Sequence, residues 1–192
     1  MNQQFKKGIK IIGIACSPFN REKDTLVTVI GAIYRGSLLL EGVLKTKVTV
    51  DGEDATDRIA KMIKQSSHYQ QLKLIMTRGV TIAGFNYIDQ TKLNDLTDLS
   101  VISVVDREPD LETIHAALKN LPNGEERYQI IMKNGPPKPM ISSSNEEPIY
   151  VQYVNMNEEA LAQLLKEITI AGRMPEPVRV ARLIALAEAT NE

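Results

Sequence analysis

Hydrophobic residues in the N-terminal quarter of the chain form three closely spaced extended runs. KIIGIA (10–15) is almost uniformly apolar, which is typical of a strand buried on both faces of a sheet. LVTVIGAIYRG (26–36) and SLLLEGVLKTKVTV (37–50) meet at Gly36, a residue that suits a tight hairpin turn. The pattern therefore predicts one buried strand followed by an antiparallel hairpin.

The rest of the chain alternates between helical and extended patterns. The predicted helices cover residues 54–66, 88–96, 110–120, 125–133, 157–171 and 178–189. The predicted strands cover residues 72–77, 99–105 and 149–154, the last at an edge of the sheet. Prolines and serines in 134–148 predict an exposed irregular loop. The order βββαβαβα is typical of an RNase H-like mixed α/β sheet flanked by helices, one of several α/β topologies that fit the pattern.

Composition restricts the classes of protein that fit this chain. Its 192 residues, 43% of them hydrophobic, suffice for a single domain, which we expect to span residues 1–192. The net charge of −1 supplies no global positive field, so nucleic-acid binding would need a local patch. The single cysteine, Cys16, excludes an internal disulfide framework. Since neither a membrane span nor a signal-peptide pattern stands out, we expect a cytoplasmic protein with no membrane partner.

Residues 48–57, VTVDGEDATD, carry the most chemically suggestive pattern. A β-branched run ends in four acids, Asp51, Glu53, Asp54 and Asp57, directly before a helical stretch. Carboxylates at such a junction can converge on a hard cation such as Mg²⁺. They also suit local roles, since Asp54 is placed to cap the helix and Asp57 lies in its favourable first turn. The local pattern favours capping and leaves a metal site open.

Arginines near the C-terminus form a second candidate group. Arg179 and Arg182 are three positions apart and share a helical face, and Arg173 lies just before that helix. These side chains could contact phosphates together with Arg78. The alternative is a solvated face whose counter-charges are nearby glutamates.

The segment RGVTIAGFNYID (78–89) forms a third candidate. Backbone amides at Gly79 and Gly84 could approach a phosphate or a base, or the glycines could serve a tight connection. Phe85 could stack on a base, although a core position is the stronger expectation. Asn86 could hydrogen-bond a base edge or cap the short helix that follows, and we favour capping.

Five motifs occur together and in order along almost the whole chain. They are IGIACSPF (12–19), VTVDGEDAT (48–56), RGVTIAGFNYID (78–89), IYVQ (149–152) and AGRMPEPVRVARLIA (171–185). Together they resemble the archaeal-type endonuclease dU family, which is similar in fold to endonuclease V and RNase H.

The resemblance implies a nuclease that hydrolyses phosphodiester bonds in DNA containing deoxyuridine or other deaminated bases, in DNA repair. Mg²⁺ or Mn²⁺ held by carboxylates would activate water and stabilise the leaving oxygen. On this basis Asp51 and Asp54 are the predicted catalytic residues and metal ligands. The predicted substrate-binding residues are Arg78, Gly79, Asn86, Arg173, Arg179 and Arg182.

The chain departs from the family pattern at two of three places that would supply metal ligands. Many members read G-[IV]-D-D-x-P-F in the first strand motif, where this chain has Ala15 and Cys16. Many read L-[DN]-G-[IV] after a later strand, where this chain has Arg78. A catalytically degenerate nucleic-acid-binding protein is therefore the alternative prediction, and an assembly role without nucleic acid is a third. The base lesion, the choice of DNA or RNA, and a homodimer stay open.

Overall fold

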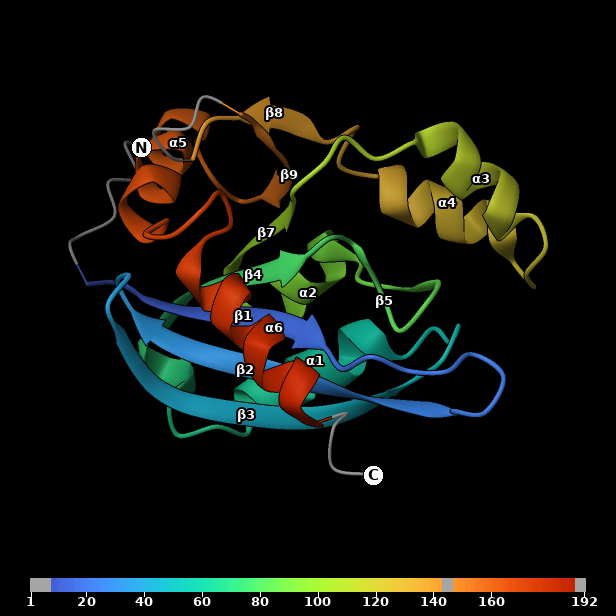
Figure 1. Cartoon of the computed structure of the whole chain (residues 1–192), viewed down its shortest axis with the longest axis horizontal. Helices are drawn as coiled ribbons and strands as arrows, with labels where there is room; N and C mark the ends of the chain where they lie inside the picture. Colours follow the sequence, from blue (N-terminus) through green and yellow to red (C-terminus); the bar gives the residue numbers. More distant parts are fainter. Residues whose placement is uncertain (1–7, 143–146, 189–192) are drawn as a thin grey trace.

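The computed structural model describes residues 8–142 and 147–188, which form a mixed sheet with helices on both faces (Figure 1). Seven strands pair in the order β3-β2-β1-β4-β7-β9-β8, and β5 and β6 form a separate two-stranded ribbon. The strands are β1 (Lys10–Cys16), β2 (Leu26–Arg35), β3 (Leu39–Thr49), β4 (Leu72–Arg78), β5 (Thr81–Ile82), β6 (Asn86–Tyr87), β7 (Ser100–Val105), β8 (Lys138–Met140) and β9 (Ile149–Val154). The helices are α1 (Ala55–Lys64), α2 (Gln90–Thr97), α3 (Leu111–Leu118), α4 (Gly124–Met132), α5 (Glu158–Ile168) and α6 (Glu176–Glu188), with a 3₁₀ turn η1 (Tyr69–Gln71).

The directions of the strands bring several strand ends to one edge of the sheet. β1, β4 and β7 are parallel neighbours. β2 is antiparallel to both β1 and β3, so β3 runs in the same direction as β1. The predicted hairpin is confirmed, and Gly36 takes the positive φ of 58° that its turn requires. The carboxyl ends of β1, β3, β4 and β7 therefore lie along the same edge.

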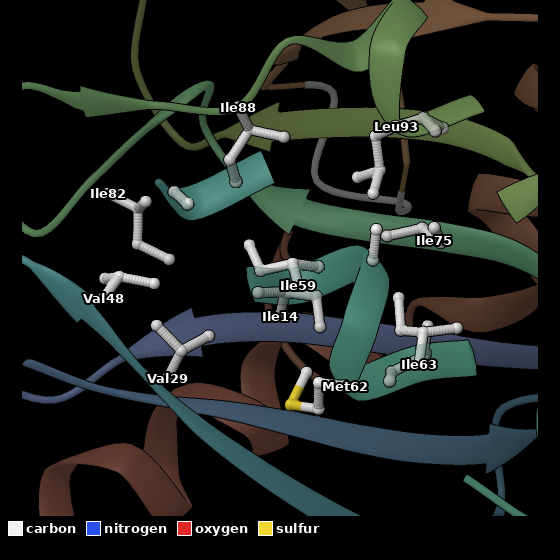
Figure 2. Packing of buried hydrophobic residues seen from close by; sticks show 14 of the residues in the cluster. Ile14, Val29, Val48, Ile59, Met62, Ile63, Ile75, Ile82, Ile88 and Leu93 are labelled. Atoms are coloured by element: carbon white, nitrogen blue, oxygen red, sulfur yellow. The ribbon is translucent and has the colours of Figure 1, made fainter. Parts of the chain in front are cut away.

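Helices α1 and α2 cover one face of the sheet. The helix predicted over residues 54–66 is confirmed, and Ala55, Ile59, Met62 and Ile63 form its buried apolar stripe. Figure 2 shows Ile59, Met62 and Ile63 of α1 packed with strand residues such as Ile14. Burial of each large aliphatic side chain contributes about 1.5–3 kcal/mol, so this layer holds the hairpin and β1 firmly together.

Helices α5 and α6 cover the opposite face. Their buried side chains pack with Ile11, Leu74 and Met76, which point away from α1. Gly13 allows an unusually close approach, since a Cβ at this position would lie 2.1 Å from the backbone carbonyl of Pro177. The first turn of α6 therefore rests directly on β1, and the helix then runs across β1 and β2 (Figure 1).

The C-terminal half of the sheet differs from the sequence prediction in one respect. β9 is not an edge strand, because it pairs with both β7 and β8. Part of the predicted irregular loop 134–148 forms β8 instead, and residues 143–146 of that loop lie outside the described residues. Pro139 lacks a backbone N–H, which is tolerated at a sheet edge and explains why the sequence pattern concealed this strand.

Helices α3 and α4 form a hairpin that projects beyond the end of the sheet (Figure 1). His115 on α3 lies 2.8 Å from a carboxylate oxygen of Glu125 on α4 and stacks on Tyr128 at 4.0 Å.

Across residues 8–142 and 147–188, no helix has the length and apolar character that crossing a bilayer requires.

Candidate nucleic-acid interface

A pocket of about 340 Å³ opens at the carboxyl ends of β1 and β4, beside the second half of α6. Its wall includes Ala15 and Cys16 at the end of β1, Ser17 directly after them, Arg78 at the end of β4, and Arg182 from α6. The chain passes from β1 to β2 on one side and later returns to β4 on the other side, so the strand order reverses here. Open α/β sheets commonly bind ligands at such a point.

Strand alternation shows which pocket residues share a face. Ala15 belongs to a small buried cluster with Ala181 of α6, so it faces that helix. Leu74 and Met76 of β4 pack on the α5–α6 side, and Arg78 continues the same alternation. Ala15, Arg78 and Arg182 thus approach one another from three elements on one face of the sheet.

The charge of the pocket wall is positive. The wall contains the guanidinium groups of Arg78 and Arg182, and among the described residues no aspartate or glutamate lines it. Arg78 lies 3.8 Å from Asp106, whose side chain is 44% exposed. Arg182 has no carboxylate within 4.0 Å among the described residues. The pocket therefore suits an anion.

The other predicted arginines are already engaged. Arg179 donates two hydrogen bonds to the buried carboxylate of Glu176, at 2.8 and 2.7 Å. These bonds raise the pKa of Arg179 above its usual value. Arg173 lies 2.9 Å from Glu147. The structure therefore separates Arg182 from Arg179 and Arg173, and among the four predicted arginines only Arg78 and Arg182 line the pocket.

Asp51 connects three loops through ordinary hydrogen bonds. Its side chain accepts the backbone N–H of Phe85 at 2.7 Å and pairs with Arg21 at 3.0 Å. Gly84 has a φ of 86°, and a Cβ there would lie 2.2 Å from the Asp51 carboxylate. The sequence requires glycine at this position because the carboxylate lies against the loop backbone.

Asp54 occupies the N-cap position of α1 but makes no side-chain cap hydrogen bond. Its carboxylate accepts the Thr49 N–H at 3.0 Å and the Asn86 amide at 2.8 Å, and pairs with Arg58 at 3.3 Å. Partial burial opposes ionisation, but the hydrogen bonds from Thr49, Asn86 and Arg58 prevail and lower the pKa of Asp54. The expectation that Asp54 caps the helix with its side chain is therefore wrong.

Asn86 supplies the missing cap from a distant strand. Its side-chain oxygen accepts the N–H of Ala55, the first residue of α1, at 3.2 Å. The short helix α2, which we expected Asn86 to cap, is capped instead by Asp89. Asn86 is fully buried and its amide group also donates to Thr49 and Asp54. The structure thus places Asn86 within the fold and outside the pocket wall.

Gly79 lines a second, more enclosed cavity of about 150 Å³ beneath the α3–α4 hairpin, and it is not part of the wall shared by Arg78 and Arg182. It has a φ of 76° and donates its N–H to the Val104 carbonyl at 3.0 Å. The Gly79 N–H therefore already has an acceptor, and a substrate-binding role for Gly79 stays a prediction.

Arg127 is a buried residue that sequence analysis missed. Its side chain is 6% exposed and holds α4 against the turn after β3 and the loop before β6. Its hydrogen bonds reach the carbonyls of Asp51, Gly52, Phe85 and Pro122 and the carboxylate of Glu53. The helical pattern of residues 125–133 gives no sign of this role, because its partners come from remote loops.

A divalent metal does not fit the side chains that the structure brings together. Within residues 8–142 and 147–188, no three His, Cys, Asp or Glu side chains are grouped so that they could hold a metal ion. At the pocket, Arg78 places a permanent positive charge where the resemblance implies an acid or amide. Asp51 and Asp54 already accept hydrogen bonds from Phe85, Thr49 and Asn86. Their assignment as metal ligands stays a prediction.

The fold is RNase H-like. The structure resembles endonuclease V of Ciona intestinalis, solved in complex with a 24mer DNA containing an inosine followed by a ribo-adenosine. The TM-score is 0.63 at 14% identity, and the match covers 98% of this chain and 88% of that one. At this level of identity the likeness shows the fold alone.

The chain belongs to the endonuclease dU family, whose sequence model matches residues 7–188. A UPF0215 protein of Methanopyrus kandleri is 40% identical over 190 residues, which are 99% of this chain and 96% of the relative. A protein of unknown function from Archaeoglobus fulgidus has a TM-score of 0.82 at 34% identity, covering 93% of this chain and 97% of that one. Family and fold together suggest a nuclease.

Proposed function

We propose that this chain is a nucleic-acid-binding member of the endonuclease dU family that holds DNA without hydrolysing it. The observation that supports the proposal is the wall of the pocket between β1, β4 and α6. Ala15, Cys16 and Arg78 stand there in place of the acids that the resemblance implies.

Hydrolysis by metal ions needs carboxylates that converge on the cations and orient the attacking water. An alanine methyl group offers no ligand, and a thiolate suits softer metals than Mg²⁺. A guanidinium group at Arg78 repels a divalent cation and attracts the phosphate that the cation would otherwise bind. The pocket therefore keeps affinity for the substrate backbone and lacks the groups for its cleavage.

The substrate class follows from the family. We propose DNA carrying deoxyuridine or another deaminated base, so that the protein would mark or protect a lesion in a repair setting. Reading such a base requires its extrusion from the stack, which costs least at a mispaired position.

A metal-dependent endonuclease for the same DNA is the second candidate. The family match over residues 7–188 favours it, and so does the presence of Asp51 and Asp54 at the same edge of the sheet. This candidate requires both carboxylates to exchange their present hydrogen bonds for Mg²⁺ or Mn²⁺.

A labelled duplex containing one deoxyuridine separates the two candidates. The protein is mixed with it at low salt, with Mg²⁺ or Mn²⁺, and both binding and strand cleavage are followed, with the undamaged duplex as control. We expect retention of the duplex and no cleavage. Metal-dependent cleavage that is lost in Asp54→Ala, with that variant still folded, would establish the second candidate instead.

A further inference from the structure

We propose that Arg78 and Arg182 form a phosphate-binding site that works without a divalent metal. The inference rests on the proposed function for the origin of the phosphate, which is a phosphate ester of nucleic acid. It goes further by assigning the contact to two named side chains and by predicting that chelators leave it intact.

The two guanidinium groups reach the pocket from separate elements. Arg78 ends β4 and Arg182 lies in the middle of α6, and both line the same cavity of about 340 Å³. A guanidinium group presents a rigid fork of donors that matches two phosphate oxygens at once. Two forks from different elements can therefore hold one phosphate from two sides.

Neither guanidinium group forms a short ion pair with a carboxylate among the described residues. Arg182 has no carboxylate within 4.0 Å among the residues that the structure describes. Arg78 lies 3.8 Å from Asp106, a long contact to a half-exposed carboxylate, and such surface pairs contribute little. Arg179, three residues before Arg182, differs in this respect, because its Nε and Nη2 atoms are both hydrogen-bonded to the Glu176 carboxylate.

The remaining wall suits the rest of a phosphate ester. Ser17 is buried at 8% exposure, and no hydrogen bond to its hydroxyl exists within the described part of the chain, so it is available as a further donor. Phe19, Ile82, Ile88 and Leu186 add apolar surface to the same wall. A wall with both charged and apolar groups fits a phosphate with an attached sugar or base, and the volume lies within the range of about 300–1,000 Å³ for small-ligand sites.

Ala15 explains why the site does not depend on metal. It faces α6 next to Ala181, on the same face as Arg78 and Arg182, and provides a methyl group where the resemblance implies a carboxylate. A carboxylate would attract a cation, and that cation would attract the phosphate. In this chain the guanidinium groups supply the positive charge directly.

Titration with inorganic phosphate in the presence of EDTA tests the site, with binding followed by phosphorus NMR or calorimetry. We expect saturable binding that is unchanged by EDTA and that falls about 10- to 100-fold in Arg182→Gln and in Arg78→Gln, the range for a lost charge-assisted contact. Lys61→Gln is the matched control, because it removes one positive charge from the exposed side of α1 on the opposite face. Binding that needs Mg²⁺, or that responds equally to all three substitutions, would overturn the proposal.

Oligonucleotides identify the source of the phosphate. A single-stranded 12-mer with a 5′-phosphate is compared with the same 12-mer with a 5′-hydroxyl, again in EDTA. Tighter binding of the 5′-phosphorylated 12-mer would identify a terminal phosphate monoester as the ligand of the site, and equal affinity would identify the backbone diester. Either conclusion requires that Arg182→Gln weakens the binding. If the 12-mers bind equally to wild type and Arg182→Gln, the site is refuted even though the proposed function stands. If phosphate binds at Arg182 but no DNA binds, the proposed function fails and the site stands.

Discussion

Substitution of Asp54 by alanine tests whether this carboxylate stabilises the fold or holds a catalytic metal ion. In the structure, Asp54 accepts the Thr49 N–H and the Asn86 amide, and through Asn86 it orients the cap of α1. Alanine would leave both donors without the carboxylate oxygen that they share. The buried Asn86 amide would lose one partner, and the orientation of its side-chain oxygen toward Ala55 would loosen.

The magnitude follows from these two donors. A donor left without a partner costs about 1–3 kcal/mol, and the lower half of that range applies because the Asp54 side chain is 29% exposed and water can replace it in part. The exposed pair with Arg58 adds little. We expect a loss of about 2–4 kcal/mol in the free energy of unfolding, which lowers the melting temperature by about 4–16 °C.

Urea denaturation followed by circular dichroism measures this loss, with Asp57→Ala as the control, since Asp57 has an exposed partner in Lys92. Retention of deoxyuridine-containing DNA at low salt should persist in Asp54→Ala at a temperature where the variant is folded. If Asp54→Ala keeps its stability but loses a metal-dependent cleavage activity, Asp54 is a metal ligand and does not support the fold.

Three further substitutions test other structural assignments. Arg127→Leu should lower the free energy of unfolding by about 3–5 kcal/mol in denaturation experiments, because it leaves the Glu53 carboxylate and several loop carbonyls without their shared donor. A loss below about 1 kcal/mol would show that Arg127 does not hold α4 against these loops. Gly13→Ala should lower the free energy of unfolding by about 1–3 kcal/mol or more, because the added methyl group clashes with the α6 backbone, and it should weaken DNA retention because Arg182 moves with α6. If stability and DNA retention are both unchanged, the close packing of α6 on β1 is disproved. The difference in the free energy of unfolding between wild type and Asp54→Asn should be largest above the unfolded pKa of about 3.9 and should shrink as the pH falls through the lowered pKa of the folded state. A difference that grows in acid would contradict the hydrogen-bond assignment.

Hydrophobic patterning predicted most of the fold because each layer depends on local periodicity. The stripe on α1, the uniformly buried β1 and the hairpin at Gly36 all follow from side-chain spacing and turn chemistry. β8 could not be predicted in the same way, since three residues around a proline carry no period. Its existence depends on β9 offering an unpaired edge, which is a tertiary fact.

The candidate site was predictable only in part. Motif positions identified Ala15, Cys16 and Arg78 as departures from the family, and the structure brings all three to one pocket. The pairing of Arg179 with Glu176 and the bond between Asn86 and Ala55 decide which side chains remain available. Which of two possible partners a side chain bonds depends on distances in the folded protein, and these distances cannot be read from spacing along a helix or strand.

Titration with Mn²⁺, followed by electron paramagnetic resonance in the absence of DNA, determines whether this chain has kept the nuclease fold but lost its metal centre. We expect only weak, non-saturating binding at millimolar Mn²⁺, with the same signal in wild type and Asp54→Ala. One saturable site at micromolar Mn²⁺ that disappears in Asp51→Ala or Asp54→Ala would show that the metal centre is present and would support a metal-dependent endonuclease.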